Sequence, residues 1–493
     1  MDSFCEAEDG KFPTNRHLKW IVTTLLVFFG VRLFYFAINI SPYVPPDEVT
    51  QFGVCKIFSK SFLLPFNSPE SYQYGLVTNI PWLYYWVMGK LLILNLFGAS
   101  DLIFLRILNI PLSFITVYYV WRLLRLLTDD RLTQILLIVA MTNTLMFSFL
   151  SASVSYDNLT NLLSAMTIYY LFAFFKEGSG NVMALFILLL LAGCLAKITF
   201  LPLALMLIIL FVVREIRHIK KFTSALKEYL KSSGILKLAV LTGIFAGILL
   251  NLQLYGGNYF HYGTINPNME NVLPLDKAMQ YRLTARNHIF NLFKQGKITI
   301  EQAKELAKQI THPSDRQDTI NMVENYAYLQ QVGFKPLGPF PYTAMWILQM
   351  LSTSFGIKAH IGMPNHGFSF IPLTILILSV LTSYIVRWRP WDLNWLPACL
   401  LGISACYAAF LMIKINYPNY VESTDIVLTV AGRYIFPVMG PVYAVSCLYL
   451  MRLFKEEKGR LGLATMAVLI LIGSDFPFFL SNATPDWYDW TLK

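Results

Sequence analysis

The chain has 493 residues, of which 56% are hydrophobic and only 14% are charged. Soluble domains carry roughly 25% charged residues, so this composition excludes a water-soluble globule and favours a membrane protein. The formal net charge of +10 lies mostly in short segments between apolar runs, where it orients a membrane protein and does not indicate nucleic acid as a partner.

Apolar runs recur along the chain at the length of about 20 residues that crosses a bilayer. They predict an all-α polytopic membrane protein with about eleven transmembrane helices. The predicted spans are residues 20–40, 103–121, 133–150, 159–175, 181–196, 198–213, 235–255, 368–387, 395–413, 434–452 and 461–480.

One further apolar stretch, residues 80–97, decides the topology. If it lies flat on the membrane, the basic clusters between spans fall on the side of the N-terminus, which is the positive-inside pattern. If it crosses, the same clusters fall outside. Its aromatic residues and Lys90 suit an interfacial helix. We therefore predict a cytoplasmic N-terminus and an extracytoplasmic C-terminus.

This topology divides the chain into three parts. Residues 1–255 form an N-terminal transmembrane module whose first outer loop is 41–102. Residues 256–367 form an extracytoplasmic, partly helical segment, in which Thr299 and Gln302 predict a capping box. Residues 368–493 supply the C-terminal transmembrane helices.

Polar residues gather at helix ends on the outer face. Asp47 and Glu48 follow the first span after two prolines, and Asp157 starts the fourth span. Lys197 interrupts a long apolar stretch, and Arg433 opens the tenth span. Ionisable residues at membrane depth are costly and indicate function by default.

Each of these residues also has a structural interpretation. Asp47 and Glu48 can stabilise a helix N-terminus, and Asp157 can be an N-cap. Lys197 can snorkel to the interface, and Arg433 with Tyr434 can form an interfacial anchor. Together, however, the two acidic and two cationic sites suit a reaction in which a phosphate leaves and a hydroxyl attacks. Lys197 and Arg433 would stabilise the phosphate charge, and Asp47 would accept the proton.

The segment Pro46-Asp47-Glu48-Val49-Thr50-Gln51-Phe52-Gly53 resembles the first outer loop of GT-C membrane glycosyltransferases. The protein O-mannosyltransferases carry a similar Asp-Glu-Val-His-Phe-Gly. The chain is most similar to a bacterial membrane-protein family with a Pro-x-Asp-Glu-x-x-His-Phe start, although Gln51 replaces that histidine.

Further elements match in order and cover roughly residues 20–455. They are Ala152-Ser153-Val154-Ser155-Tyr156-Asp157, Leu195-Ala196-Lys197, Tyr255-Gly256-Gly257-Asn258 and Gly432-Arg433-Tyr434-Ile435-Phe436-Pro437.

The resemblance implies a GT-C-like fold with flat outer helices and a polyprenyl-phosphate-linked sugar donor. It implies that Asp47 is the catalytic base, with Glu48 beside it for substrate hydroxyls, and that Lys197 and Arg433 bind the donor phosphate. Asp157 is similar to a second-loop acidic residue that helps to bind metal in some members. A divalent metal is therefore a possible cofactor, and its ligands are unknown.

We expect an inverting glycosyltransferase in a bacterial inner membrane. It would move one sugar to a cell-envelope glycan or glycolipid, such as O-antigen or lipopolysaccharide, on the extracytoplasmic face. Substrate contacts are expected from Asp157, Tyr156, Tyr434, Tyr259 and His261, of which the last two are equally well interpreted as interface anchors.

Three alternatives stay open. A glycan polymerase or ligase would depend mainly on outer arginines, with the Asp47/Glu48 site dispensable. A lipid-linked-sugar transporter or flippase would have paired repeats and charges at mid-bilayer depth. A pseudoenzyme would keep the fold as a binding module.

Overall fold

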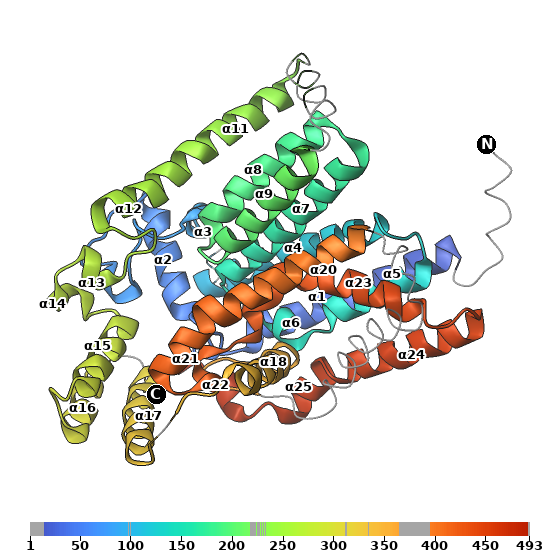
Figure 1. Cartoon of the computed structure of the whole chain (residues 1–493). Helices are drawn as coiled ribbons and strands as arrows, with labels where there is room; N and C mark the ends of the chain where they lie inside the picture. The colour runs from blue at the N-terminus through green and yellow to red at the C-terminus, as the bar shows by residue number, and fades with distance from the viewer. Residues whose placement is uncertain are drawn as a thin grey trace, which may run out of the picture.

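The structure is a computed structural model, and it is built from helices (Figure 1). It describes residues 14–491 except 97, 99, 217–222, 224–226, 228, 230, 232, 311–312, 334 and 364–394. Across this part of the chain the β pairing is a single bridge between Ile357 and Met363.

Seven described helices are long and apolar enough to cross a membrane. They include α1 (Asn15–Asn39), α4 (Asp101–Arg125) and α7 (Tyr156–Glu177). The others are α11 (Ile235–Asn251) continued by α12 (Gly257–Tyr262), α20 (Trp395–Phe410) continued by α21 (Tyr417–Ser423), α23 (Phe436–Met451) with the turn before it, and α24 (Glu457–Gly473) continued by α25 (Phe476–Asn482).

The remaining predicted spans have different outcomes. The span 133–150 is a pair of helices, α5 (Arg131–Thr142) and α6 (Leu145–Ser151), bent by 65°. The spans 181–196 and 198–213 are the apolar helices α8 (Gly180–Ala196) and α9 (Phe200–Ile216), of 17 residues each. The span 368–387 lies outside the described residues. The all-α membrane architecture is thus confirmed, with seven or eight spans among the described residues.

The first loop returns to the helical bundle through α2 (Glu48–Lys60) and α3 (Leu83–Leu92), which pack against each other, and α3 also packs against α4. With 10 residues, α3 is too short to cross a bilayer, which takes about 20. This length agrees with the flat helix predicted within 80–97.

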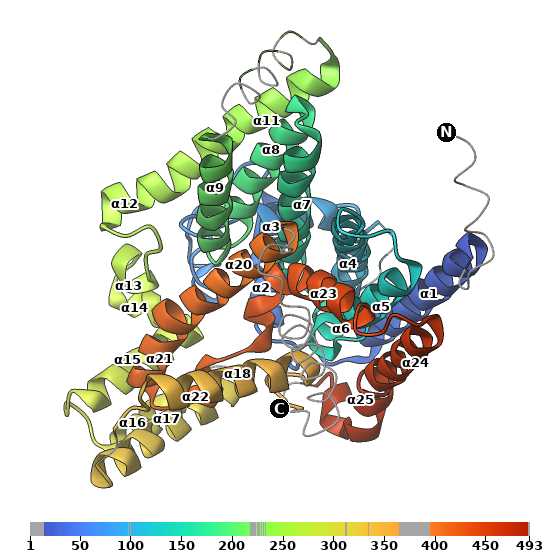
Figure 2. The ribbon, with the colours of Figure 1, turned by 45° about the vertical axis from the view of Figure 1, so that its right-hand side comes forward.

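The helices α13 to α18 lie at the end of the molecule that also holds α21 and α22 (Ile426–Thr429), as Figures 1 and 2 show. They are α13 (Met269–Val272), α14 (Leu275–Ala278), α15 (Arg282–Lys294), α16 (Ile300–Ala307), α17 (Pro313–Gln331) and α18 (Pro339–Phe355). α15, α16 and α17 share a small core with Ile289, Phe290 and Val323. The capping box of Thr299 and Gln302 at the start of α16 is confirmed.

The C-terminal residues pack against the start of the first loop. The Ser41 amide donates to the Trp487 carbonyl at 2.9 Å, and the Trp490 indole donates to the Asn39 carbonyl at 3.1 Å. Trp487 is 1% exposed and sits on Phe149 and Phe479. The end of the chain and the first loop therefore lie on the same side of the helical bundle.

Candidate functional site

Asp47 is positioned by an unusual turn. It is the N-cap of α2, and its φ of 61° and ψ of 8° lie in the left-handed region that residues other than glycine rarely adopt. Its side chain forms no capping hydrogen bond with α2. Strain of this kind persists where surrounding contacts fix it, and it often occurs at functional sites. The carboxylate is thus turned away from its own helix.

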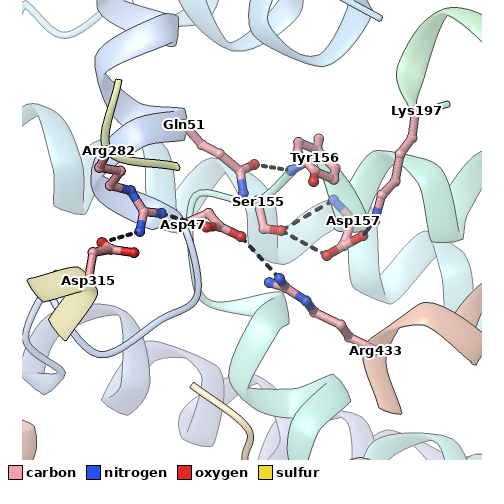
Figure 3. Close-up of polar contacts among 9 residues, drawn as sticks. All are labelled: Asp47, Gln51, Ser155, Tyr156, Asp157, Lys197, Arg282, Asp315 and Arg433. Carbon is pink, nitrogen blue, oxygen red and sulfur yellow. Dashed lines mark hydrogen bonds and ion pairs between the residues drawn. The ribbon is translucent and has the colours of Figure 1, made fainter. Parts of the chain in front are cut away.

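Two arginines from distant segments hold the two oxygens of this carboxylate (Figure 3). Arg282 Nη2 lies 2.7 Å from Asp47 Oδ1, and Arg433 Nη2 lies 3.0 Å from Asp47 Oδ2. Arg282 opens α15, whereas Arg433 lies in the turn that enters α23. The site therefore joins the segment 256–367 to the transmembrane helices.

These arginines control the protonation of Asp47. Burial would raise the pKa of the carboxyl group, but Arg433, Arg282 and His360 lower it, so the net pKa lies well below its ordinary value. In this arrangement Asp47 is a carboxylate at neutral pH and a weak base. It becomes a stronger base if a ligand draws one of the arginines away.

Arg282 has a second carboxylate partner. Its Nη1 lies 2.5 Å from Asp315 Oδ2 in α17, and the Asp315 side chain is 2% exposed. Burial would lower the pKa of Arg282, but Asp47 and Asp315 raise it. Arg282 is therefore anchored from two sides, whereas Arg433 Nε is buried without a hydrogen-bond partner in the described part of the chain.

A second ion pair lies where α8 ends. The Lys197 ammonium is 2.5 Å from Asp157 Oδ1, and both side chains are less than 10% exposed. Lys197 also lies 4.6 Å from the ring centre of Tyr156 and 5.5 Å from that of Tyr434, at cation–π distances. Ser155, rather than Asp157, is the N-cap of α7. The capping interpretation of Asp157 is therefore wrong, and the break predicted at Lys197 is confirmed.

A cavity of about 810 Å³ connects these groups. Asp47, Tyr156, Lys197 and Tyr434 line one part of it, and residues of α13, α15 and α21 line another part. The partners Asp157, Arg282 and Arg433 are not among the lining residues and adjoin the cavity through their ion pairs with Lys197 and Asp47. The π-helical turn Leu411–Asn416 also contributes to the wall, and such turns are frequent at functional sites. The cavity is large enough for a sugar-sized ligand.

Gln51 is a cavity residue to which the sequence assigned no role. It is 2% exposed, and its Oε1 accepts a hydrogen bond of 2.7 Å from the Tyr156 amide, which fixes the start of α7. Among the described residues its Nε2 has no partner. A buried donor without a partner costs roughly 1–3 kcal/mol, so this amide is well placed to donate to a ligand oxygen.

Glu48 does not stand beside Asp47 as a substrate ligand. It is 1% exposed, is absent from the cavity wall, and pairs through both oxygens with the buried Arg106. The Val154 amide donates to Glu48 Oε1 at 2.7 Å. With its acceptor sites occupied, Glu48 ties α2 to α4 and to the start of α7.

Tyr259 and His261 also lie away from the cavity. Tyr259 is 65% exposed on α12, and neither side chain lines the cavity wall. Their position agrees with the alternative interpretation as interface anchors. The described residues contain no group of three or more His, Cys, Asp or Glu side chains arranged to hold a metal ion.

The site thus pairs three cations with three carboxylates. Lys197, Arg282 and Arg433 face Asp157, Asp315 and Asp47 respectively, and Arg282 also shares Asp47. An anion that enters must compete with a carboxylate for its cation. A hydroxyl that approaches Asp47 meets a general base whose strength depends on that competition.

The comparisons with known proteins gave structural matches. The chain is similar to the apo crystal structure of ArnT from Cupriavidus metallidurans, with a TM-score of 0.36, 12% identity, and coverage of 87% of this chain and 77% of that chain. The structure of ArnT from the same organism bound to undecaprenyl phosphate gives a TM-score of 0.36 and 12% identity, over 87% and 76%. No protein family and no curated protein matched the sequence.

Proposed function

We propose that the chain is an inverting glycosyltransferase of the GT-C type. It would transfer a monosaccharide from a polyprenyl-phosphate donor to a cell-envelope glycan or glycolipid on the extracytoplasmic face of a bacterial inner membrane. The observation that carries the proposal is the Asp47 carboxylate, held between Arg282 and Arg433 at a cavity that also contains Lys197. This geometry provides a base and fixed cations for one ligand.

Asp47, Arg433 and Lys197 each have a role in the proposed reaction. The acceptor oxygen attacks the anomeric carbon and gives its proton to Asp47, while the bond between that carbon and the phosphate oxygen breaks. The electron pair leaves with polyprenyl phosphate, whose charge changes from about −1 to about −2. Arg433 and Lys197 stabilise this added charge, which develops only in the transition state. Attack opposite the departing phosphate inverts the anomeric centre.

The ion pairs give the reaction an order. When the donor phosphate binds, Arg433 can leave Asp47 Oδ2 for a phosphate oxygen, while Arg282 stays fixed by Asp315. Loss of one cationic partner strengthens Asp47 as a base at the moment when the donor is present. In this scheme Asp157 keeps Lys197 in position, and Tyr156 and Tyr434 flank the ammonium.

The test is sugar transfer by the purified full chain in lipid nanodiscs. Radiolabelled polyprenyl-phosphate sugars and membrane glycolipids are supplied to the wild type and to Asp47→Asn. Removal of a general base costs about 10²–10⁴-fold in rate. The matched control is Asp101→Asn, since Asp101 is a half-exposed carboxylate outside the cavity.

The two rates decide the proposal. The proposed function is supported if Asp47→Asn loses sugar transfer and Asp101→Asn keeps it, with both proteins folded. Equal transfer by Asp47→Asn and wild type removes Asp47 from the mechanism and favours a polymerase or ligase that uses the arginines. Movement of the lipid-linked sugar across the bilayer without transfer would favour a flippase.

A further inference from the structure

The cavity wall built by α13, α15 and α21 differs chemically from the part that holds the ion pairs. We call this part the outer wall. It presents the amides of Asn268, Asn287, Asn291 and Asn419. Within the described residues, Asn291 and Asn419 form no side-chain hydrogen bond with the rest of the protein. Amide groups offer both donors and acceptors, which is what a hydroxyl-rich ligand requires.

The charges of the outer wall also favour an uncharged ligand. Glu270 and Glu422 face the cavity together with Arg286, so this wall has a net charge of about −1. An anionic headgroup would be repelled there, since like charges disfavour each other across a binding surface. An uncharged ligand meets no such penalty.

Aromatic rings complete this surface. Tyr74, Tyr281 and Phe290 line the same cavity, and rings of this kind supply rigid apolar faces among polar groups. A long acyl chain would need a continuous apolar lining, which a wall of amides and carboxylates does not provide. A carbohydrate has both hydroxyl edges and apolar ring faces.

A buried donor supports the presence of a ligand independently. Gln51 Nε2 is without a partner among the described residues, and the side chain is 2% exposed at the cavity wall near Asp47 and Tyr156 (Figure 3). Its Oε1 is occupied by the Tyr156 amide, so the free group is a donor of fixed orientation. It is suited to the oxygen of a hydroxyl group.

We propose that the outer wall is an acceptor subsite for a neutral oligosaccharide, with Gln51 orienting the hydroxyl that Asp47 deprotonates. This inference rests on the proposed function and narrows its acceptor to an uncharged glycan chain. The charged, phosphate-bearing sugars of an anionic glycolipid are disfavoured. Asn291 and Asn419 bind the oligosaccharide, and Glu270 and Glu422 exclude anionic sugars.

The experiment measures binding, so that it does not depend on catalysis. Calorimetry on the full chain in nanodiscs uses linear neutral gluco- and manno-oligosaccharides of three to six units and uronic-acid oligosaccharides of the same lengths. Each neutral oligosaccharide is tested both free and as a neutral glycolipid. Polyprenyl phosphate is titrated in parallel as the probe of the cationic part.

Three variants test the outer wall. The double variant Asn291→Ala with Asn419→Ala is expected to lose at least about tenfold in affinity for a neutral oligosaccharide and to keep its affinity for polyprenyl phosphate. Asn321→Ala, an exposed residue of α17 outside the cavity, is the matched control and leaves both affinities unchanged. Glu270→Gln with Glu422→Gln is expected to improve binding of the uronic-acid series.

The outcomes separate the two proposals. If polyprenyl phosphate binds but no neutral oligosaccharide does, or if the uronic-acid series binds more tightly to wild type, the subsite is overturned and the proposed function stands. If neither probe binds, the proposed function fails with it. If the double alanine variant binds the neutral oligosaccharide as tightly as wild type does, the acceptor site lies elsewhere in the molecule and the subsite is overturned.

Discussion

Asp47 and Arg433 are 386 residues apart in the sequence, and their side chains meet at 3.0 Å beside the cavity. The pair joins the start of α2 to the turn that enters α23. In the proposed reaction the same guanidinium is needed by the donor phosphate. Asp47 is therefore the base of the reaction, and before it acts it competes with the donor phosphate for Arg433.

This competition predicts an effect opposite to that of an ordinary active-site substitution. Asp47→Asn removes the charge that holds Arg433, so affinity for polyprenyl phosphate should rise by about tenfold, or 1.4 kcal/mol. Calorimetric titration of the variant measures it, with Asp101→Asn as the control. An unchanged or weaker affinity would mean that Arg433 does not pass from Asp47 to the phosphate.

The Arg282–Asp315 pair holds α15 against α17 and so fixes the Arg282 side chain that links the segment 256–367 to Asp47. The Asp315 side chain is buried at 2% exposed and that of Arg282 is mostly buried at 11%, and loss of one partner from a buried pair costs up to roughly 3–5 kcal/mol. Asp315→Asn should therefore raise hydrogen exchange in α15 and α17 and lower sugar transfer. The salt-bridged but exposed Glu305, changed to Gln, is the control. Protection of α15 that stays at the wild-type level in Asp315→Asn would contradict the link.

Much of this organisation is readable from the sequence, because apolar length fixes most spans and charged residues at helix ends are few. On that basis the sequence singles out Asp47, Asp157, Lys197 and Arg433, and the structure joins them in two ion pairs, of which Asp47 and Lys197 line the cavity. These residues interrupt apolar patterns, so they can be recognised from the sequence alone.

The rest of the site was not visible, since it depends on contacts across the chain. Arg282 and Asp315 lie in a polar segment where charged residues are common, and nothing in their local spacing distinguishes them. Gln51 stands where the family that this segment resembles has histidine, which is the one signal that the sequence offers. The position of Glu48 next to Asp47 predicts a shared role at the substrate, yet successive residues at a helix start face different directions.

Glu48 and Arg106 make a prediction about stability rather than catalysis. Both side chains are at most 1% exposed, and Arg106 also donates to the Ile40 carbonyl at 2.6 Å. Arg106→Met leaves a buried carboxylate without its cation and should lower the melting temperature strongly. Adding Glu48→Gln removes that charge and should recover part of the loss.

Transfer activity distinguishes this structural role from a catalytic one. Per folded molecule, the double variant of Glu48 and Arg106 should keep activity within about tenfold of wild type. A loss as large as that of Asp47→Asn, in a protein that melts normally, would return Glu48 to the reaction.

The proposed sidedness predicts the labelling of two loops. In a variant whose six cysteines are replaced by serine, a cysteine at Glu70 should react with an impermeant maleimide in intact cells. A cysteine at Glu456, in the exposed loop before α24, should react only after lysis. The reverse pattern would place the cavity on the cytoplasmic side.

Lys358 predicts the pH dependence of donor binding. Its ammonium donates to the Val427 and Val430 carbonyls, the latter at 2.8 Å, just before Arg433. Burial and the neighbouring Arg433 lower the pKa of Lys358 to about 8. The side chain is therefore charged at pH 7 and loses its charge as the pH rises through 8. Because a positive charge near Arg433 favours a bound phosphate, affinity for polyprenyl phosphate should fall between pH 7 and pH 9.

Two substitutions test this assignment. Lys358→Arg keeps its charge across this range, so its affinity should stay level up to pH 9. Lys358→Met should bind weakly at pH 7 and show little further change, since the titrating group is gone. If Lys358→Met kept the wild-type decline, another group would be responsible, and Lys358 would only hold the turn before Arg433 in place through its two carbonyl contacts.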